Sequence, residues 1–146
     1  MAVDPDVDLH VPEQRAVDAA LLAAIAAGGV LGAETRYAVG RLLDTPIGGW
    51  PWDTWLVNVT GSFLLGVLMA VLATVPRPHR LVRPFLGVGV LGGFTTFSTA
   101  MVEVPDLLGA GRPALALAYL AGTAVSALLA TALGTWLVRA VRGGRA

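Results

Sequence analysis

The sequence predicts an all-α membrane protein with four transmembrane helices, and its composition and its apolar segments carry that prediction. Of its 146 residues, 55% are hydrophobic and only 14% are charged, whereas a soluble domain typically contains about 25% charged residues. Four apolar stretches of about 20 residues are each long enough to cross roughly 30 Å of hydrocarbon. They account for most of the chain, so we expect one membrane domain with short loops.

The beginning of the chain is the most acidic part of the sequence. Residues 1–18 carry five carboxylates and one arginine, the reverse of the positively charged start of a secretory signal. We interpret them as a solvated acidic tail. The predicted four-helix domain then covers residues 19–142, and residues 143–146 form a C-terminal tail.

The first span is predicted at about 19–43. It is rich in alanine and contains glycines that allow close helix contact. Glu34 and Arg36 lie near its end, close enough to neutralise each other or a neighbouring helix end. The following loop, 44–53, combines prolines and glycines with tryptophans, which is typical of a turn at the level of the lipid headgroups.

The second span is predicted at about 53–75 and is followed by a loop at 76–84. That loop contains three arginines and three prolines, so it is not expected to be helical. The third span is predicted at about 85–108 and the fourth at about 113–138. The fourth span leads into an arginine-rich end of the chain.

The third span is predicted to be broken at its centre, where residues 92–99 read GGFTTFST. Lipid contains no water to hydrogen-bond the backbone N–H and C=O groups that a helix break leaves unpaired. Such a break must therefore be buried in protein or face a polar cavity. The glycines permit an irregular backbone. Released carbonyls can hold a cation, and hydroxyl donors can hold an anion. The alternative is a kink in which threonines bond back to the preceding turn.

Asn58 is a second polar feature at membrane depth, near the start of the second span. A side-chain amide in a span is costly unless it is paired, so Asn58 should face another helix or a pore. In a pore its NH2 group can donate to an anion. A hydrogen bond that only joins two helices is the alternative.

In the fourth span, Tyr119, Thr123 and Ser126 are spaced by four and three residues, so they share one helical face. A row of hydroxyls offers an anion donors without a fixed charge that would trap it. Ordinary packing is the alternative for each of these residues. Phe97 lies beside the hydroxyl residues of the third span, and the positive edge of its ring can contact a small anion.

Glu103 follows in the third span, and an acid at that depth is expected to be functional or paired. In an anion pathway its charge would repel the ion, unless the carboxyl is protonated or lies in a wider vestibule. No Ser/His or paired-Asp constellation lies within the spans, and phosphate-binding glycine loops are absent from the sequence, so we expect no enzyme activity. Zero net charge without a basic face argues against nucleic acid as a partner.

The arginines indicate an orientation in the membrane. With four spans, the two termini and the loop at 76–84 lie on one side, which carries seven of the ten arginines: Arg15, Arg77, Arg80, Arg83, Arg139, Arg142 and Arg145. The other side has Arg41 and Arg112, with Arg36 near the end of the first span. The positive-inside rule therefore predicts a multi-pass protein of the cell (inner) membrane with both termini in the cytoplasm.

Four motifs, taken in order, resemble those of the Fluc, or CrcB, family of fluoride channels. They are GVLGAETRY at 29–37, NVTGSFLLG at 58–66, GVGVLGGFTTFSTA at 87–100 and YLAGTAVSALL at 119–129. The resemblance covers about 25–140. It implies a fluoride-selective channel subunit that lowers cytoplasmic fluoride by passive export. It also implies a dual-topology dimer in which two subunits insert antiparallel and form two pores along their interface.

The resemblance also implies roles for particular residues. Asn58, Phe97, Tyr119 and Thr123 would line the pore. The main-chain carbonyls of Gly92 and Thr95 would hold a structural sodium ion, Na+, at the dimer interface. Arg36 would match the arginine near the end of the family's first helix, and Glu103 the acid that faces a central vestibule. Thr96, Ser98 and Ser126 complete the candidate fluoride pathway through their hydroxyls.

The chain departs from the family pattern at two positions. Ala100 stands where the family usually has a second phenylalanine, and Ala127 stands where a further hydroxyl would extend the row of Tyr119 and Thr123. We therefore hypothesise that this subunit pairs with a paralogous, oppositely oriented chain. Two other functions remain open: a small multidrug-type four-helix exporter, and a structural membrane partner without transport.

Overall fold

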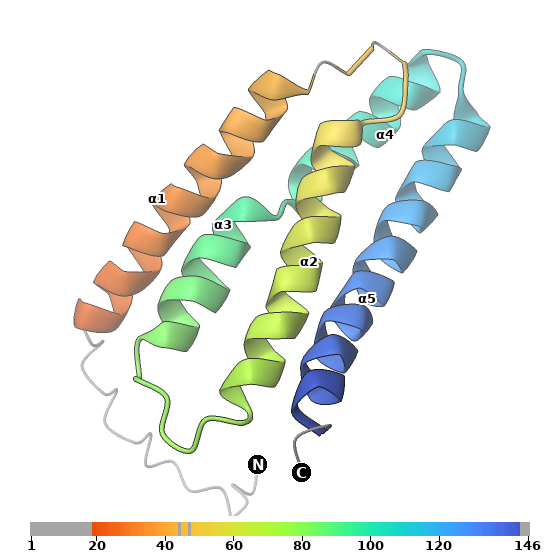
Figure 1. The fold of residues 1–146 in the computed structure, drawn as a ribbon. Coiled ribbons are helices and arrows are strands. Elements are labelled where there is room, and N and C mark those ends of the chain that lie inside the picture. Colours follow the sequence, from red (N-terminus) through yellow and green to blue (C-terminus); the bar gives the residue numbers. More distant parts are fainter. Residues whose placement is uncertain (1–18, 44, 47, 144–146) are drawn as a thin grey trace, which may run out of the picture.

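The computed structural model (Figure 1) describes residues 19–43, 45–46 and 48–143, and in these residues every regular element is helical. In chain order the elements are α1 (Ala19–Leu42), α2 (Trp52–Leu72), the π-helix η1 (Arg83–Leu91), α3 (Gly92–Phe94), α4 (Phe97–Gly109) and α5 (Pro113–Gly143). Four segments, Ala19–Leu42, Trp52–Leu72, Arg83–Gly109 and Pro113–Gly143, are long and apolar enough to span a membrane. The predicted four spans are therefore confirmed within the described part of the chain.

The four spans lie alongside one another and alternate in direction (Figure 1). The α1–α2 and α4–α5 connections lie at one end of the bundle, which we call the loop end. The connection between α2 and η1 lies at the other end, together with the start of α1 and the end of α5. The predicted acidic tail at 1–18 and residues 144–146 lie outside the described residues.

The fourth span is longer than the sequence indicated. α5 contains 31 residues and runs to Gly143, whereas the prediction ended at about 138. At 1.5 Å per residue this is about 46 Å, which exceeds the hydrocarbon thickness. The arginines of its last turns do not end the helix, because a cation near a helix C-terminus is favourable.

Glycines bring the helices into direct backbone contact. Gly28 of α1 faces η1, and a Cβ atom there would overlap the Phe85 carbonyl oxygen and lie 2.9 Å from Val90 N. Gly66 of α2 packs in the same way against the backbone of α5, and Gly134 of α5 packs against the backbone of α2. Without a hydrophobic driving force between helices in lipid, such close packing is a main source of association.

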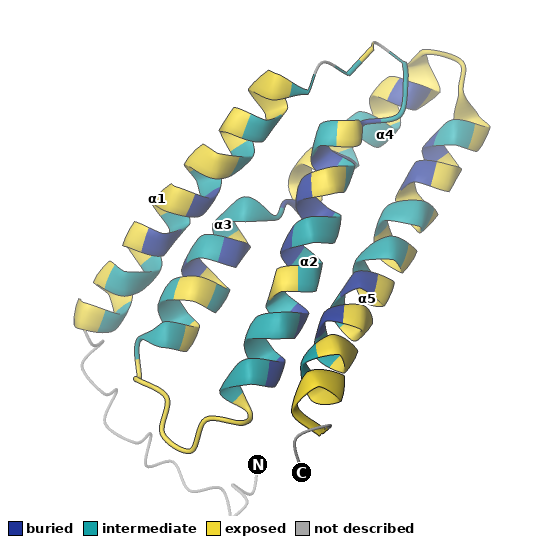
Figure 2. Ribbon diagram, viewed as in Figure 1, coloured by how far each residue is buried: buried dark blue, intermediate teal, exposed yellow. Residues whose placement is uncertain are grey.

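Exposed positions lie along all four spans (Figure 2), and many of them carry large apolar side chains, as expected in lipid. Leu128, for example, is 72% exposed. Thr54, Asn58 and Thr96 are the buried polar side chains among the described residues, apart from the Tyr119 hydroxyl. Thr54 and Asn58 lie one turn apart on α2 and Thr96 lies between α3 and α4, so the buried polar groups meet in the middle of the bundle.

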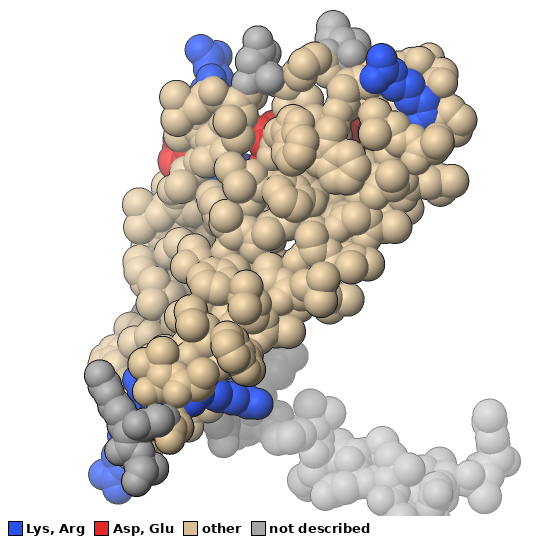
Figure 3. Space-filling model, turned by 45° about the vertical axis from the view of Figure 1, so that its right-hand side comes forward, with Lys and Arg blue, Asp and Glu red and all other residues tan. Residues whose placement is uncertain are grey.

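Charge is distributed unevenly between the two ends. The described carboxylates, on Glu34, Asp53, Glu103 and Asp106, all belong to the half of the bundle nearer the loop end. On the face drawn in Figure 3, red side chains are seen only toward that end, whereas blue ones occur at both ends. The end opposite the loop end, which we call the basic end, holds Arg77, Arg80, Arg83, Arg139 and Arg142.

Two adjacent glycines of α1 provide a matched test of this packing. We expect Gly28→Ala to lower the free energy of unfolding by about 1–3 kcal/mol relative to Gly29→Ala, because only the first introduces an overlap. A Cβ atom at Gly29 meets nothing within 4 Å, and both changes gain the same helix propensity. Thermal unfolding in detergent, followed by tryptophan fluorescence, measures the difference. Equal melting temperatures would contradict the α1–η1 contact.

Candidate functional site

The third span changes from helix to extended backbone for two residues at its centre. α3 ends at Phe94, Thr95 has φ −79° and ψ 155°, and Thr96 has φ −148° and ψ 122° before α4 begins. The Thr95 hydroxyl donates to the Leu91 carbonyl oxygen at 2.9 Å, so one threonine does bond back to the preceding turn. The Thr96 hydroxyl instead accepts from Thr99 N at 3.1 Å and caps α4.

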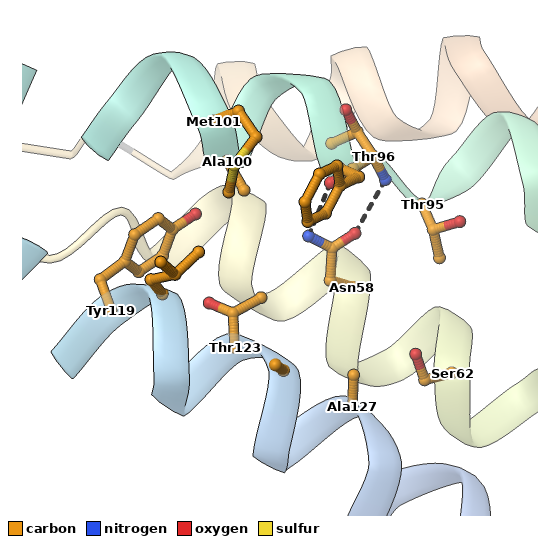
Figure 4. Close-up of a pocket in the computed structure, with 12 residues that line it drawn as sticks. Asn58, Ser62, Thr95, Thr96, Ala100, Met101, Tyr119, Thr123 and Ala127 are labelled. Atoms are coloured by element: carbon orange, nitrogen blue, oxygen red, sulfur yellow. Dashed lines mark hydrogen bonds between the residues drawn. The ribbon is translucent and has the colours of Figure 1, made fainter. Parts of the chain in front are cut away.

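Asn58 binds both main-chain polar groups of Thr96 (Figure 4). Its Nδ2 donates to the Thr96 carbonyl oxygen at 2.8 Å, and its Oδ1 accepts from Thr96 N at 2.8 Å. The break is therefore satisfied by protein rather than by water, as a membrane requires. The amide carries two N–H bonds, and within the described part of the chain the second one makes no hydrogen bond.

A cavity of about 250 Å³ lies beside the break, between α2, α4 and α5. Figure 4 shows Asn58, Thr123 and Tyr119 around it, from two different helices. The Thr123 hydroxyl oxygen is buried next to the Tyr119 hydroxyl and makes no hydrogen bond of normal length among the described residues. The cavity is lined by Asn58, Ser62, Thr95, Thr96, Phe97, Ala100, Met101, Tyr119, Leu120, Thr123, Ala124 and Ala127.

The cavity wall combines a few polar donors with apolar surface. Five of the predicted pathway residues, Asn58, Thr96, Phe97, Tyr119 and Thr123, come together here. Phe97 is 74% exposed, so its ring stands at the outer surface of the bundle.

Tyr119 does not offer its hydroxyl hydrogen to the cavity. Its hydroxyl donates to Glu103 Oε2 at 2.5 Å, and the Thr54 hydroxyl donates to Glu103 Oε1 at 2.6 Å. The Tyr119 ring is fully buried and packs edge-on against Trp50, with 5.4 Å between ring centroids. Tyr119 therefore lines the cavity with its ring, and its hydroxyl, which the sequence placed in a row of donors, is bonded to Glu103.

Glu103 belongs to a separate, more acidic cavity at the loop end. That cavity measures about 570 Å³, and Asp53 and Asp106 also line it. Both carboxylate oxygens of Glu103 accept hydrogen bonds, so the acid is paired, which is one of the two expectations for a carboxyl group at this depth. Its bond to Tyr119 connects the acidic cavity with the cavity beside the break.

Two predicted pathway residues lie apart from the cavity beside the break. The Ser126 hydroxyl donates to the Gly122 carbonyl oxygen at 2.5 Å, which leaves it bonded to its own helix. Ser98 is exposed, and its hydroxyl lies 3.3 Å from that of Thr96. The periodicity placed Ser126 on the face of Tyr119 and Thr123, but a serine in a helix can bond to the preceding turn and then has no free donor.

Arg36 contacts the end of a neighbouring helix rather than Glu34. Its Nη1 donates to the Thr95 carbonyl oxygen at 3.4 Å, where the carbonyl dipoles at the end of α3 leave partial negative charge. The described residues contain no ion pair between Glu34 and Arg36, so of the two possibilities the sequence left open, the helix-end contact is found. Arg36 also lines a cavity of about 310 Å³ with Asp53, Thr54, Thr96 and Thr99.

The two residues predicted to hold sodium differ in conformation. The Thr95 carbonyl follows an extended residue and is released from the helical ladder, whereas Gly92 is helical, with φ −66° and ψ −35°, and is exposed. Groups of three or more His, Cys, Asp or Glu that could hold a metal ion are absent from the described residues. A cation held by main-chain oxygens therefore stays a prediction, for which Thr95 offers a released carbonyl oxygen that also accepts from Arg36 Nη1.

The sequence did not single out every residue of the site. The Thr54 hydroxyl donates to the Glu103 carboxylate. Thr54 lies four residues before Asn58, so this spacing could have placed both residues on the same face of α2. Met101 and Leu120 line the cavity but carry no polar signal that could mark them in an apolar span.

Comparison with known proteins gives a consistent result. The family model described as CrcB-like protein, Camphor Resistance (CrcB), matches residues 23–135. The fluoride-specific ion channel FluC 2 of Nocardia farcinica is 50% identical over 127 residues, which are 87% of this chain and 91% of that protein. The fluoride-specific ion channel FluC 1 of Streptomyces coelicolor is 50% identical over 123 residues, 84% of this chain and 80% of that protein.

A third relative, the fluoride-specific ion channel FluC 2 of Thermobifida fusca, is 53% identical over 112 residues, 75% of this chain and 82% of that protein. The family model covers more than half of the chain, and these three relatives match most of its length. The resemblance predicted from the four sequence motifs is thus confirmed, and the chain belongs to the CrcB-like family.

Proposed function

We propose that this chain is the subunit of a fluoride-selective ion channel that lowers cytoplasmic fluoride by passive export across the cell membrane. The observation that carries the proposal is the convergence of two unused donors on one cavity: the second amide N–H of Asn58 and the hydroxyl of Thr123. The three relatives described above are named fluoride-specific ion channels, and that naming agrees with the chemistry of the cavity.

Neutral donors suit an ion that must both enter and leave. A hydrogen bond to a charged group contributes about 1.5–3 kcal/mol, so an amide and a hydroxyl replace part of the hydration of fluoride without fixing the ion in place. A lysine or arginine in the same place would bind it too strongly for conduction. The N-terminal end of α4, at Phe97, adds the positive end of a helix dipole near the cavity.

The cavity borders the outer surface of the bundle, where Phe97 is exposed. Polar groups there would have no partner in lipid. We propose that a second, antiparallel subunit covers this face and completes the pathway, so that the positive ring edge of Phe97 can contact the ion. The resemblance to the family supports the dual topology in this proposal.

A structural sodium ion belongs to the same proposal. The carbonyl oxygens of Gly92 and Thr95, with those of the second subunit, would hold it at the dimer interface. The bound cation would offset the partial negative charge at the end of α3 in each subunit. In this chain, Arg36 already donates to the Thr95 carbonyl oxygen.

The arginines of the basic end support an orientation with both termini in the cytoplasm, in the cell (inner) membrane. A fixed orientation, together with Ala100 and Ala127 in the cavity wall, supports pairing with a paralogous chain of opposite orientation. In such a pair the partner would supply the aromatic and hydroxyl groups that these two alanines lack.

The small multidrug exporter is less well supported, because such a transporter needs an acid deep in its first span. Glu34 is exposed and lies in the second half of α1. A structural partner without transport would give the unused donors of the cavity no role.

We expect Asn58→Asp to abolish fluoride efflux from liposomes that contain the purified chain, because aspartate has no amide donors and its charge repels the anion. Ser126→Ala is the matched control, since Ser126 bonds to its own helix, and it should retain wild-type efflux. Chloride should not leave the liposomes in either case. If the chain conducts only after a paralogous subunit is added, pairing is supported; if it does not conduct with any partner, the channel proposal fails.

Thr123→Val tests the second donor at nearly constant volume. Loss of one hydrogen bond to a charged ion should slow fluoride efflux roughly tenfold or more. Thr123→Ser keeps the hydroxyl and should lose less than threefold. Equal rates for the valine and serine variants would show that the hydroxyl does not contact the ion.

A further inference from the structure

The basic end of the bundle holds a second kind of cavity, which the fluoride pathway does not use. It measures about 460 Å³ and lies where α2 ends and η1 begins. Its floor is apolar, and its rim is basic. The lining residues are Met69, Leu72, Ala73, Pro78, His79, Arg80 and Arg83.

Arg83 is suited to bind an anion in this cavity. Its side chain is exposed, and its guanidinium makes no hydrogen bond or ion pair within the described residues. Its stem runs along η1, with Cγ 4.0 Å from the position of a Cβ atom on Gly87, and Met69 borders the same glycine. A guanidinium is a planar fork of donors that matches a phosphate group.

The surroundings of the cavity reinforce this charge. His79 Nδ1 accepts from Leu81 N at 3.3 Å, which leaves Nε2 as the ring nitrogen able to donate outward. Arg142 at the end of α5 is tied to the Thr74 hydroxyl beside α2. The described carboxylates all lie toward the loop end, so none of them neutralises this end of the bundle. Blue side chains mark this end in Figure 3.

We propose that this cavity binds an anionic phospholipid, with the phosphate on Arg83 and the start of an acyl chain on Met69 and Leu72. The cavity presents charge at its rim and apolar side chains toward the membrane centre, and a phospholipid presents phosphate and hydrocarbon in that same order. Basic pockets between membrane helices recognise anionic headgroups in this way. The proposal is independent of fluoride conduction.

The test is lipid binding to the full-length chain in native mass spectrometry, with phosphatidylglycerol and phosphatidylcholine of equal chain length. We expect phosphatidylglycerol to bind at least fivefold more tightly. Arg83→Gln should reduce that preference about fivefold, the effect of one arginine near an anionic surface. Arg112→Gln removes one positive charge at the loop end instead and should leave the preference for phosphatidylglycerol unchanged. Equal affinity for both lipids, or equal effects of both substitutions, would overturn the proposal.

The acidic segment 1–18 is the competing occupant, because it carries five carboxylates. A full-length variant with Asp4→Asn, Asp6→Asn, Asp8→Asn, Glu13→Gln and Asp18→Asn separates the two. If phosphatidylglycerol occupies the site in the native chain, this variant should bind it within about twofold of wild type. A gain of tenfold or more would mean that the segment fills the cavity, and the lipid proposal would be wrong.

Discussion

The two hydrogen bonds between Asn58 and the main chain of Thr96 are the constraint on which the rest of the site depends. A membrane span can leave the helical path only where protein supplies the missing partners, because an unsatisfied peptide group in hydrocarbon costs several kcal/mol. One side-chain amide meets both the donor and the acceptor of Thr96. The extended residues at 95 and 96 can therefore persist at membrane depth, and the third span becomes two half-helices with their ends inside the bundle.

These internal helix ends organise the charges around them. Arg36 lies at the C-terminal end of α3, where partial negative charge gathers, and the N-terminal end of α4 lies beside the cavity that contains the unused donors. Farther along α4, Glu103 accepts from both Thr54 and Tyr119 and so fixes the aromatic wall of the cavity. Within the described part of the chain, the second N–H of Asn58 and the Thr123 hydroxyl make no hydrogen bond, because the neighbouring polar groups are bonded among themselves, as expected for a site that exchanges an ion.

Sequence alone predicted the four spans, because their length and apolar character are set by the thickness of the membrane, and it placed the irregular segment within 92–99. The sequence could not identify the partner of Asn58, because that partner lies 38 positions away. It left a pore donor and an interhelical bond as alternatives. In the structure, Asn58 makes the interhelical bond with one N–H. The differences between the expected and the observed hydrogen bonds have one physical origin. Spacing assigns a residue to a helix face but does not say whether its polar group is free, so Ser126 and the Tyr119 hydroxyl were expected as donors although both are engaged elsewhere.

In the proposed pathway, Asn58 holds the break with one amide hydrogen and offers the other to the anion. Asn58 is the only asparagine in the sequence, so a sample labelled with 15N-asparagine gives one pair of side-chain amide signals without ambiguity. On titration of the purified channel with fluoride, we expect one of the two amide protons to shift strongly while the proton bonded to Thr96 stays in place, and we expect chloride to shift neither. Two protons that both ignore fluoride, or that move together as solvent-exposed amides do, would contradict the proposed pathway.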